Sequence, residues 1–225
     1  MDDKKKVFNK TLLAKSDGMV SFGAYPQASY PPSAVNEKTP IFWHVLDRAD
    51  GGLFLLSEKI LECIRYDFSF KETSWQDSDI RKWLNNEFYN EAFNSEEKTR
   101  ILLRRCIGNG AGSQNDLPET DDRVFLLNSA EVEKYKSEPG ADLRVSKFRA
   151  SGTHRAKRNG LYVNYLGDYG SDGYSWWWLR NRGFGSKACA AYVHIGGEAD
   201  EKNNGSLAVR GDLGARPAII LKMED

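Results

Sequence analysis

The order in which hydrophobic patterns change along the chain constrains its fold most. Short apolar runs rich in β-branched and aromatic residues come first, a helical stripe follows, and the last third returns to short strand-like pieces with tight turns. The turn residues Asp50-Gly51-Gly52 separate the runs 41–46 and 53–56, which predicts a β-hairpin. Because strands and helices do not alternate, we expect an α+β domain rather than a parallel doubly wound sheet.

One amphipathic helix is predicted from about Ser78 to Tyr89. Its apolar residues recur at intervals of three and four, as one face of a helix requires. These residues are Ile80, Trp83, Leu84 and Phe88.

A second helix is predicted to start at Asn94. Asn94 and Glu97 have the spacing of a capping box, in which each side chain accepts a hydrogen bond from the other residue's backbone. The apolar residues 101–103 are assigned to this helix, and the glycines from Gly108 onward are predicted to follow its end.

Asn128 and Glu131 have the same spacing and predict a short helix through Tyr135. The apolar run 124–127 before them is expected to be a short buried strand. In total, we expect two or three helices with short antiparallel strands and a loop-rich C-terminal half.

Composition bounds the class of protein. The chain has 225 residues, with 32 Lys plus Arg balanced by 32 Asp plus Glu, so no nucleic-acid partner is expected. The lysine-rich residues 1–18 are interpreted as an N-terminal arm, and residues 19–225 as a single domain. No apolar run is long enough to cross a bilayer and no secretory signal is recognised, so we expect a cytoplasmic protein without membrane contact.

The cysteines and histidines do not indicate a catalytic or metal centre. Cys63, Cys106 and Cys189 are odd in number and far apart, which favours reduced, buried thiols. Cys189 and His194 lie five positions apart on an expected strand, and therefore on opposite faces. We expect no catalytic residue, no metal site and no cofactor, although turn acids such as Asp168 leave calcium as an alternative.

The triplet Trp176-Trp177-Trp178 is the most unusual aromatic feature. Alternate side chains of a strand face opposite ways, so at least one of the three indoles is a candidate surface platform. Trp176 and Trp178 are expected to pack under loops with their N–H groups bonded to backbone carbonyls. Trp177 is the candidate for stacking on a sugar or a base.

A basic stretch covers residues 143–158. It contains six Lys and Arg residues and no acid, and we interpret it as a solvated loop rather than a nucleic-acid site. The glycines at positions 108, 110 and 112 lack the strand and helix that a phosphate-binding loop requires, so a flexible turn is expected there.

Five segments, taken together, resemble a domain of unknown function common in gut Firmicutes. In that family the motifs read approximately FGxYPQ, PIxWxVLD, IRxWLN, WWLRSPG and GVRPAL. The matching segments are Val20 to Gln27, Pro40 to Asp47, Ile80 to Asn85, Trp177 to Arg180, and Gly214 to Ile219. They occur in the same order and cover nearly the whole chain from about residue 19 to 222.

This resemblance implies a C-type-lectin-like fold. Its late half is similar to formylglycine-generating enzymes and to the variable proteins of diversity-generating retroelements, which end in a similar buried-arginine motif. Arg180 and Arg216 are accordingly assigned structural roles. The chain departs from the family pattern at Asn181-Arg182-Gly183, where Ser-Pro-Gly is usual.

The resemblance also implies a function: a non-catalytic protein that presents its C-terminal surface to a protein or glycan ligand. The expected ligand-binding residues are Trp177, Asn181, Arg182, Phe184, Ser186, Lys187, Tyr192, His194, Glu198, Asp200, Asn203 and Asn204. One alternative is a carbohydrate-binding module that uses Trp177, Tyr192 and turn acids. The other is an oxidoreductase of the formylglycine-generating type, for which Cys106 and Cys189 would have to meet in space.

Overall fold

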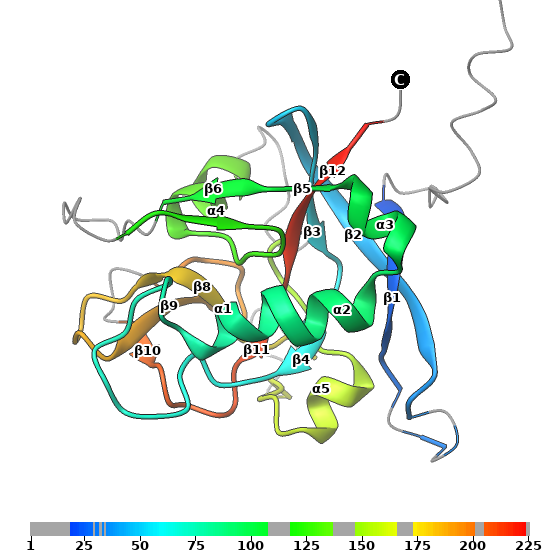
Figure 1. Cartoon of the computed structure of the whole chain (residues 1–225). Coiled ribbons are helices and arrows are strands. Elements are labelled where there is room, and N and C mark those ends of the chain that lie inside the picture. The colour runs from blue at the N-terminus through cyan, green and yellow to red at the C-terminus, as the bar shows by residue number, and fades with distance from the viewer. Residues whose placement is uncertain are drawn as a thin grey trace, which may run out of the picture.

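The structure is a computed structural model that describes residues 19–28, 30–31, 33, 35–107, 118–136, 147–165, 173–200 and 205–223. The expected N-terminal arm and the glycine-rich turn at 108–112 lie outside these residues. Within them the chain is a mixed α+β structure, as the patterns predicted, and sheet dominates it (Figure 1).

The first sheet has five strands in the order β1-β2-β3-β12-β5, with every neighbouring pair antiparallel. Its strands are β1 (Met19–Pro26), β2 (Lys38–Ala49), β3 (Gly52–Ser57), β12 (Ala218–Lys222) and β5 (Ile101–Leu102). The predicted hairpin is confirmed as β2–β3. Its turn residues Asp50 and Gly51 have φ angles of 53° and 79°, which a two-residue turn of this hand requires.

The second sheet has the order β10-β9-β8-β11-β4. Its strands are β10 (Ser206–Leu207), β9 (Cys189–Val193), β8 (Trp177–Arg182), β11 (Gly214–Ala215) and β4 (Glu62–Cys63). The β8–β11 pair is parallel and the other pairs are antiparallel. Two further strands, β6 (Arg104–Cys106) and β7 (Thr120–Asp122), form a small separate ladder.

The helix predicted at 78–89 is confirmed. Ser78 caps it by accepting a hydrogen bond from the Arg81 N–H, and α1 (Asp79–Trp83), a π-helical turn η3 (Leu84–Phe88) and α2 (Tyr89–Ala92) follow without a break. The stripe buries Ile80, Leu84 and Phe88, while Trp83 stays half-buried. Figure 1 shows this helix crossing the front of the molecule.

The second predicted helix starts where expected but is shorter. Asn94 and Glu97 form both hydrogen bonds of a capping box at the start of α3 (Ser95–Arg100). Residues 101–103 are not helical, which corrects the prediction. Ile101 and Leu102 instead form β5 and pair with β12, because an apolar run gains more from a place at the sheet than from continuing a helix of six residues.

The third predicted helix is confirmed as α4 (Ser129–Lys136), with Asn128 and Glu131 bonded reciprocally at its start. The run 124–127 before it is fully buried, but only Phe125 forms a bridge, to Ala218. The expectation of a strand there is therefore wrong beyond that single pair of residues.

A fourth helical segment was not expected. Residues His154–Arg158 form α5, which Thr153 caps through the Ala156 N–H. The described part of the basic stretch is thus not a solvated loop. Arg155 is paired with Glu62 at 2.6 Å, and this ion pair ties α5 to β4.

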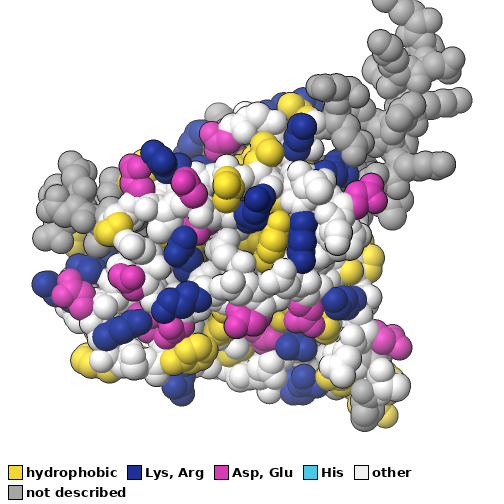
Figure 2. Space-filling view, in the orientation of Figure 1, with side chains coloured by type: hydrophobic (Ala, Val, Ile, Leu, Met, Phe, Trp, Pro, Cys, Tyr) yellow, Lys and Arg dark blue, Asp and Glu magenta, His cyan; other side chains and the backbone are white. Residues whose placement is uncertain are grey.

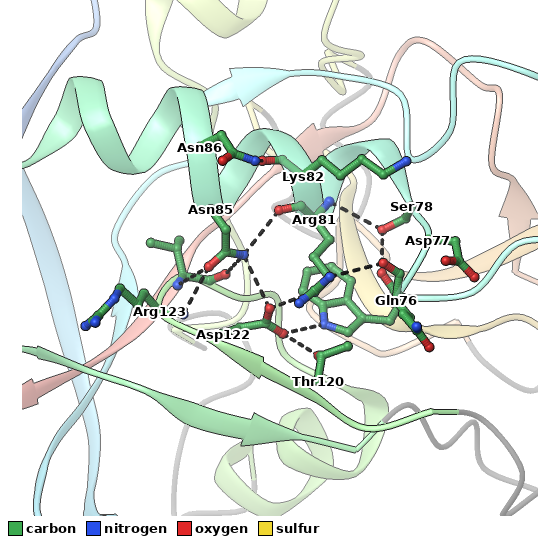
Figure 3. Close-up of polar contacts among 12 residues, drawn as sticks. Gln76, Asp77, Ser78, Arg81, Lys82, Asn85, Asn86, Thr120, Asp122 and Arg123 are labelled. Atoms are coloured by element: carbon green, nitrogen blue, oxygen red, sulfur yellow. Dashed lines mark hydrogen bonds and ion pairs between the residues drawn. The ribbon is translucent and has the colours of Figure 1, made fainter.

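The motif Ile80 to Asn85 has a structural explanation (Figure 3). The buried Asp122 carboxylate accepts hydrogen bonds from Arg81 Nε at 2.7 Å and from Trp75 Nε1 at 2.8 Å. Asn85 accepts from the backbone N–H groups of Arg123 and Val124. The helix is thereby fastened to the segment that follows β7.

Charges of both signs are interspersed on the surface, as Figure 2 shows for one face, in agreement with the balanced composition. In the part of the chain that the structure describes, no helix has the length and apolar character needed to cross a bilayer.

Candidate functional site

The tryptophan triplet lies mostly in the interior. Trp177 and Trp178 are both fully buried, and their indole N–H groups donate to the backbone carbonyls of Phe148 and Ile64. Side chains of adjacent strand residues point to opposite faces of a sheet. Both indoles are nevertheless buried, because both faces of the sheet are covered at β8. Trp177 therefore has no surface for stacking on a ligand, which corrects the expected role of this residue.

Trp176 is the half-buried member of the triplet and the centre of an aromatic group. The Tyr162 ring stacks on its indole at 4.2 Å between centroids, and the Arg210 guanidinium lies 4.7 Å from the same ring system. Tyr192 and His194 each lie 6.1 Å from it. We name these five residues the Trp176 cluster.

Backbone hydrogen bonds join the segments that carry Tyr162, Trp176 and Arg210. Tyr162 N–H donates to the Asp212 carbonyl at 2.9 Å, and Gly214 N–H donates to the Trp176 carbonyl at 3.2 Å. The Asp212 carboxylate holds Arg210 with two hydrogen bonds of 2.6 and 2.9 Å. This fork fixes the guanidinium, so Arg210 meets the indole already oriented.

Two polar atoms beside the cluster have no hydrogen-bond partner. The Trp176 indole N–H and one Asp200 carboxylate oxygen are both covered and unpaired. The Tyr192 hydroxyl bonds to the Asp200 carboxylate; burial and this bond raise the pKa of Tyr192, which keeps the phenol protonated. An unmade hydrogen bond of a buried group costs about 1–3 kcal/mol, so the cluster would gain from a group that both donates and accepts.

The hairpin after β9 carries several of the predicted residues. His194 N–H donates to the Glu198 carbonyl at 2.8 Å, and Asp200 N–H donates to the Tyr192 carbonyl at 2.7 Å. Glu198 is exposed and reaches Lys136 at 4.0 Å. Of the predicted ligand-binding residues, Tyr192, His194, Glu198 and Asp200 are thus brought together at this end of β9.

A second group lies at the other end of the β8–β9 hairpin. Arg182 donates to the Thr73 carbonyl at 2.9 and 3.1 Å and to Glu72, and Lys187 lies 3.4 Å from Glu72. Phe184 is 53% exposed in the same loop. Ser186 is exposed and its hydroxyl accepts from the Ala188 N–H.

The predicted surface is therefore divided. Tyr192 follows Lys187 by five positions, which is roughly 16 Å at about 3.3 Å per residue. Asn181 joins neither group, because it is fully buried and its amide bonds to Ser129 at the start of α4. Asn203 and Asn204 lie outside the described residues.

Arg216 lies in the interior. It is fully buried and donates to the backbone carbonyls of Ser57, Glu58 and Lys147. Its guanidinium also lies 5.0 Å from the Trp177 ring. These contacts tie the end of β3 and residue 147 to the segment before β12.

Arg180 also lies in the interior, where it forms a two-pronged pair with Glu131 at 2.6 and 3.1 Å. Arg104 reaches the same carboxylate at 2.8 Å. Burial on its own would raise the pKa of Glu131, but the charge and hydrogen bonds of Arg180, with Arg104, outweigh it and hold the pKa below its ordinary value.

This lowered pKa predicts an acid-dependent loss of stability. The ionised Glu131 contributes stability that is complete above its unfolded-state pKa and is lost as pH falls through the lower folded-state pKa. Urea unfolding between pH 7 and pH 3 should therefore show a steeper acid loss for the parent than for Glu131→Gln. Equal slopes for the two proteins would contradict the assigned pair.

None of the three cysteines forms a disulfide. All three are free, and Cys106 and Cys189 lie on strands of different sheets. Burial raises the pKa of Cys63 and of Cys106 to about 12, so neither is a thiolate at neutral pH. Among the residues with described positions, no three His, Cys, Asp or Glu side chains are grouped to hold a metal ion.

Three of the five cluster residues are not predicted as binding residues from the sequence. The sequence pattern predicts that Trp176 packs under a loop, and it gives no signal for Tyr162 or Arg210. The only available signal was the alternation within the triplet, which places Trp176 on the same face of the sheet as Trp178. The other residues of the cluster lie on segments that are distant in sequence, and no local pattern indicates that these segments contact Trp176.

Comparison with known proteins gives one match. No curated protein and no solved structure matches the chain. Residues 50–223 match a protein family described as a domain of unknown function, DUF6273. This range contains α1, both ends of the β8–β9 hairpin and the closing Gly214 to Ile219 segment, and the chain belongs to the DUF6273 family.

Proposed function

We propose that the chain is a non-catalytic ligand-binding protein of C-type-lectin-like fold that uses the Trp176 cluster to bind a protein or glycan. The observation that carries the proposal is that two covered polar atoms lack a hydrogen-bond partner: the Trp176 indole N–H, and one carboxylate oxygen of Asp200, which bonds to Tyr192 of the same cluster. Sugars and peptides carry both donors and acceptors, so either kind of ligand can supply the missing partners.

The residue types of the cluster support a binding role. Tyr, Trp and Arg are the side chains that most often concentrate binding energy, and here Arg210 and the aromatic rings are held in place before any ligand arrives. The fork to Asp212 and the stack with Tyr162 reduce the entropy that a ligand would otherwise have to offset. Arg180 and Arg216 stiffen the frame beneath the loops.

The expected test result is a loss of binding confined to one end of the hairpin. On a glycan array, Trp176→Phe and Asp200→Asn should each lower binding at least about tenfold. Trp176→Phe removes the indole N–H but keeps an aromatic ring, and Asp200→Asn removes the charge of the carboxylate but keeps the shape of the side chain. Phe184→Ala and Lys187→Gln, at the other end, should leave binding unchanged. If the parent protein binds a glycan and all four variants bind it equally well, the Trp176 cluster is not the binding site.

We further propose that the protein is a variable protein of a diversity-generating retroelement. The test is to sequence the DNA around the gene for a reverse transcriptase and a near-copy of the codons for residues 176–216 that differs only at adenines. Substituted codons should fall on exposed positions at the cluster end of the hairpin, such as Glu198, and spare the buried Trp177. Absence of both elements would leave a binding protein with a fixed ligand.

A carbohydrate-binding module is the second candidate, favoured by the flat stack of Tyr162 on Trp176 and by Asp200, whose carboxylate bonds to Tyr192 of the same cluster. A carbohydrate-binding module has one fixed glycan ligand, whereas the ligand of a diversified protein changes with the substituted codons. An oxidoreductase of the formylglycine-generating type has less support, because it needs a thiol pair and Cys106 and Cys189 lie in different sheets.

A further inference from the structure

A cavity of about 460 Å³ opens between the start of β2, the segment after β3 and the start of α5. It shares no residue with the Trp176 cluster. Its volume falls within the range of about 300–1,000 Å³ that is usual for small-molecule sites. Its wall combines apolar groups, chiefly Pro40, Phe42 and Leu61, with polar and charged side chains.

The three walls are tied to one another by hydrogen bonds. Gln27 donates its amide N–H to the carbonyls of Thr39 and Pro40 at 3.2 and 3.0 Å. The Arg155 N–H in turn donates to the Gln27 carbonyl at 3.0 Å, and the Thr153 hydroxyl donates to the Leu61 carbonyl at 3.1 Å. The cavity is therefore formed before a ligand enters.

The charges that face this cavity are mostly positive. Lys59 and Lys157 line it, and within the described part of the chain neither lysine takes part in an ion pair. The one acid on the lining is Glu58, whose backbone carbonyl accepts from the buried Arg216 at 3.2 Å. The Glu58 carboxylate acts electrostatically on Arg216, and the two lysines outnumber this one acid on the lining.

We propose that this cavity binds a small organic anion, with its carboxylate or phosphate group between Lys59 and Lys157 and its apolar part against Phe42 and Pro40. An ammonium group bonds to either kind of anion with a charge-assisted hydrogen bond. The half-buried Phe42 ring supplies the apolar contact. The volume of the cavity suits a small molecule.

Three probes separate the charge from the apolar contact: phenyl phosphate, inorganic phosphate and benzyl alcohol. Titration at low ionic strength, followed by backbone amide NMR shifts and calorimetry, should show the tightest saturable binding for phenyl phosphate. Benzyl alcohol should bind at least about tenfold more weakly. The shifted amides should include Lys59, Gly152 and Lys157.

Variants test the site directly. The double variant Lys59→Gln/Lys157→Gln should weaken binding of phenyl phosphate at least about tenfold, whereas Lys222→Gln, an exposed lysine outside the cavity, should not. Ala28→Trp fills the cavity without changing its charge and should abolish binding. No saturable binding of either phosphate, an unchanged affinity in the double variant, or an equal loss in Lys222→Gln would overturn the proposal.

Discussion

Replacing Glu131 with alanine is expected to lower the free energy of unfolding by about 3–5 kcal/mol, because it leaves the buried Arg180 guanidinium without its counter-charge. Arg180 is 3% exposed and cannot turn to solvent without unpacking β8. The same carboxylate also accepts from Arg104 and from the Asn128 N–H at the start of α4. One substitution therefore breaks the pair, a second cation contact and a helix cap.

A milder variant separates the contribution of the Glu131 charge from that of its side-chain shape. Glu131→Gln keeps the shape of the side chain and one oxygen acceptor but removes the charge, so its loss should be smaller, about 1–3 kcal/mol. Glu87→Ala removes an exposed carboxylate from the long helix and should change stability by less than about 0.5 kcal/mol. Chemical denaturation of the three variants and the parent gives these values. A loss below about 1 kcal/mol for Glu131→Ala would mean that Arg180 is solvated in the native state.

The parts of the fold that could be predicted are those encoded by neighbouring residues. The turn Asp50-Gly51 fixes the β2–β3 hairpin because both residues tolerate positive φ. The apolar spacing of the helix at 79–92 and the two Asn–Glu capping boxes are likewise local. Each of these signals lies within about ten residues, so the sequence specifies it without reference to the rest of the chain.

The parts that could not be predicted depend on distant segments. Ile101 is in a strand rather than in the predicted helix, because it pairs with Leu221, 120 positions later in the chain. Strand alternation correctly places Trp177 on the opposite face from its two neighbours, but nothing nearby indicates that the Phe148 segment covers that face.

The candidate site shows the same limit. The predicted surface residues are close in sequence, yet the strands between them hold Tyr192 and Lys187 at opposite ends of one hairpin. Proximity along the chain was a poor guide, because a hairpin brings together residues on facing strands and separates residues at its two ends. Arg210 and Tyr162 reach Trp176 only through the tertiary fold.

Replacing Asp122 with alanine is the second large expected loss, about 3 kcal/mol. Asp122 is buried, and Figure 3 shows it at the centre of the network that joins the long helix to β7. Its carboxylate accepts from Trp75, Arg81 and the Thr120 hydroxyl, the last at 2.6 Å. Alanine would leave the buried Trp75 indole N–H without an acceptor and would remove the charged partner of Arg81, whose guanidinium keeps only the Gln76 carbonyl.

The neighbouring Asp121 is a matched control, since it lies on the same strand but is exposed and pairs with the exposed Arg105. Asp121→Ala should change the unfolding free energy by less than about 0.5 kcal/mol. A double-mutant cycle with Arg81→Ala should show a coupling of about 1–3 kcal/mol, because the two side chains share one hydrogen bond at 2.7 Å. Equal losses for the two aspartates, or no coupling between positions 81 and 122, would contradict the structural explanation of the Ile80 to Asn85 motif.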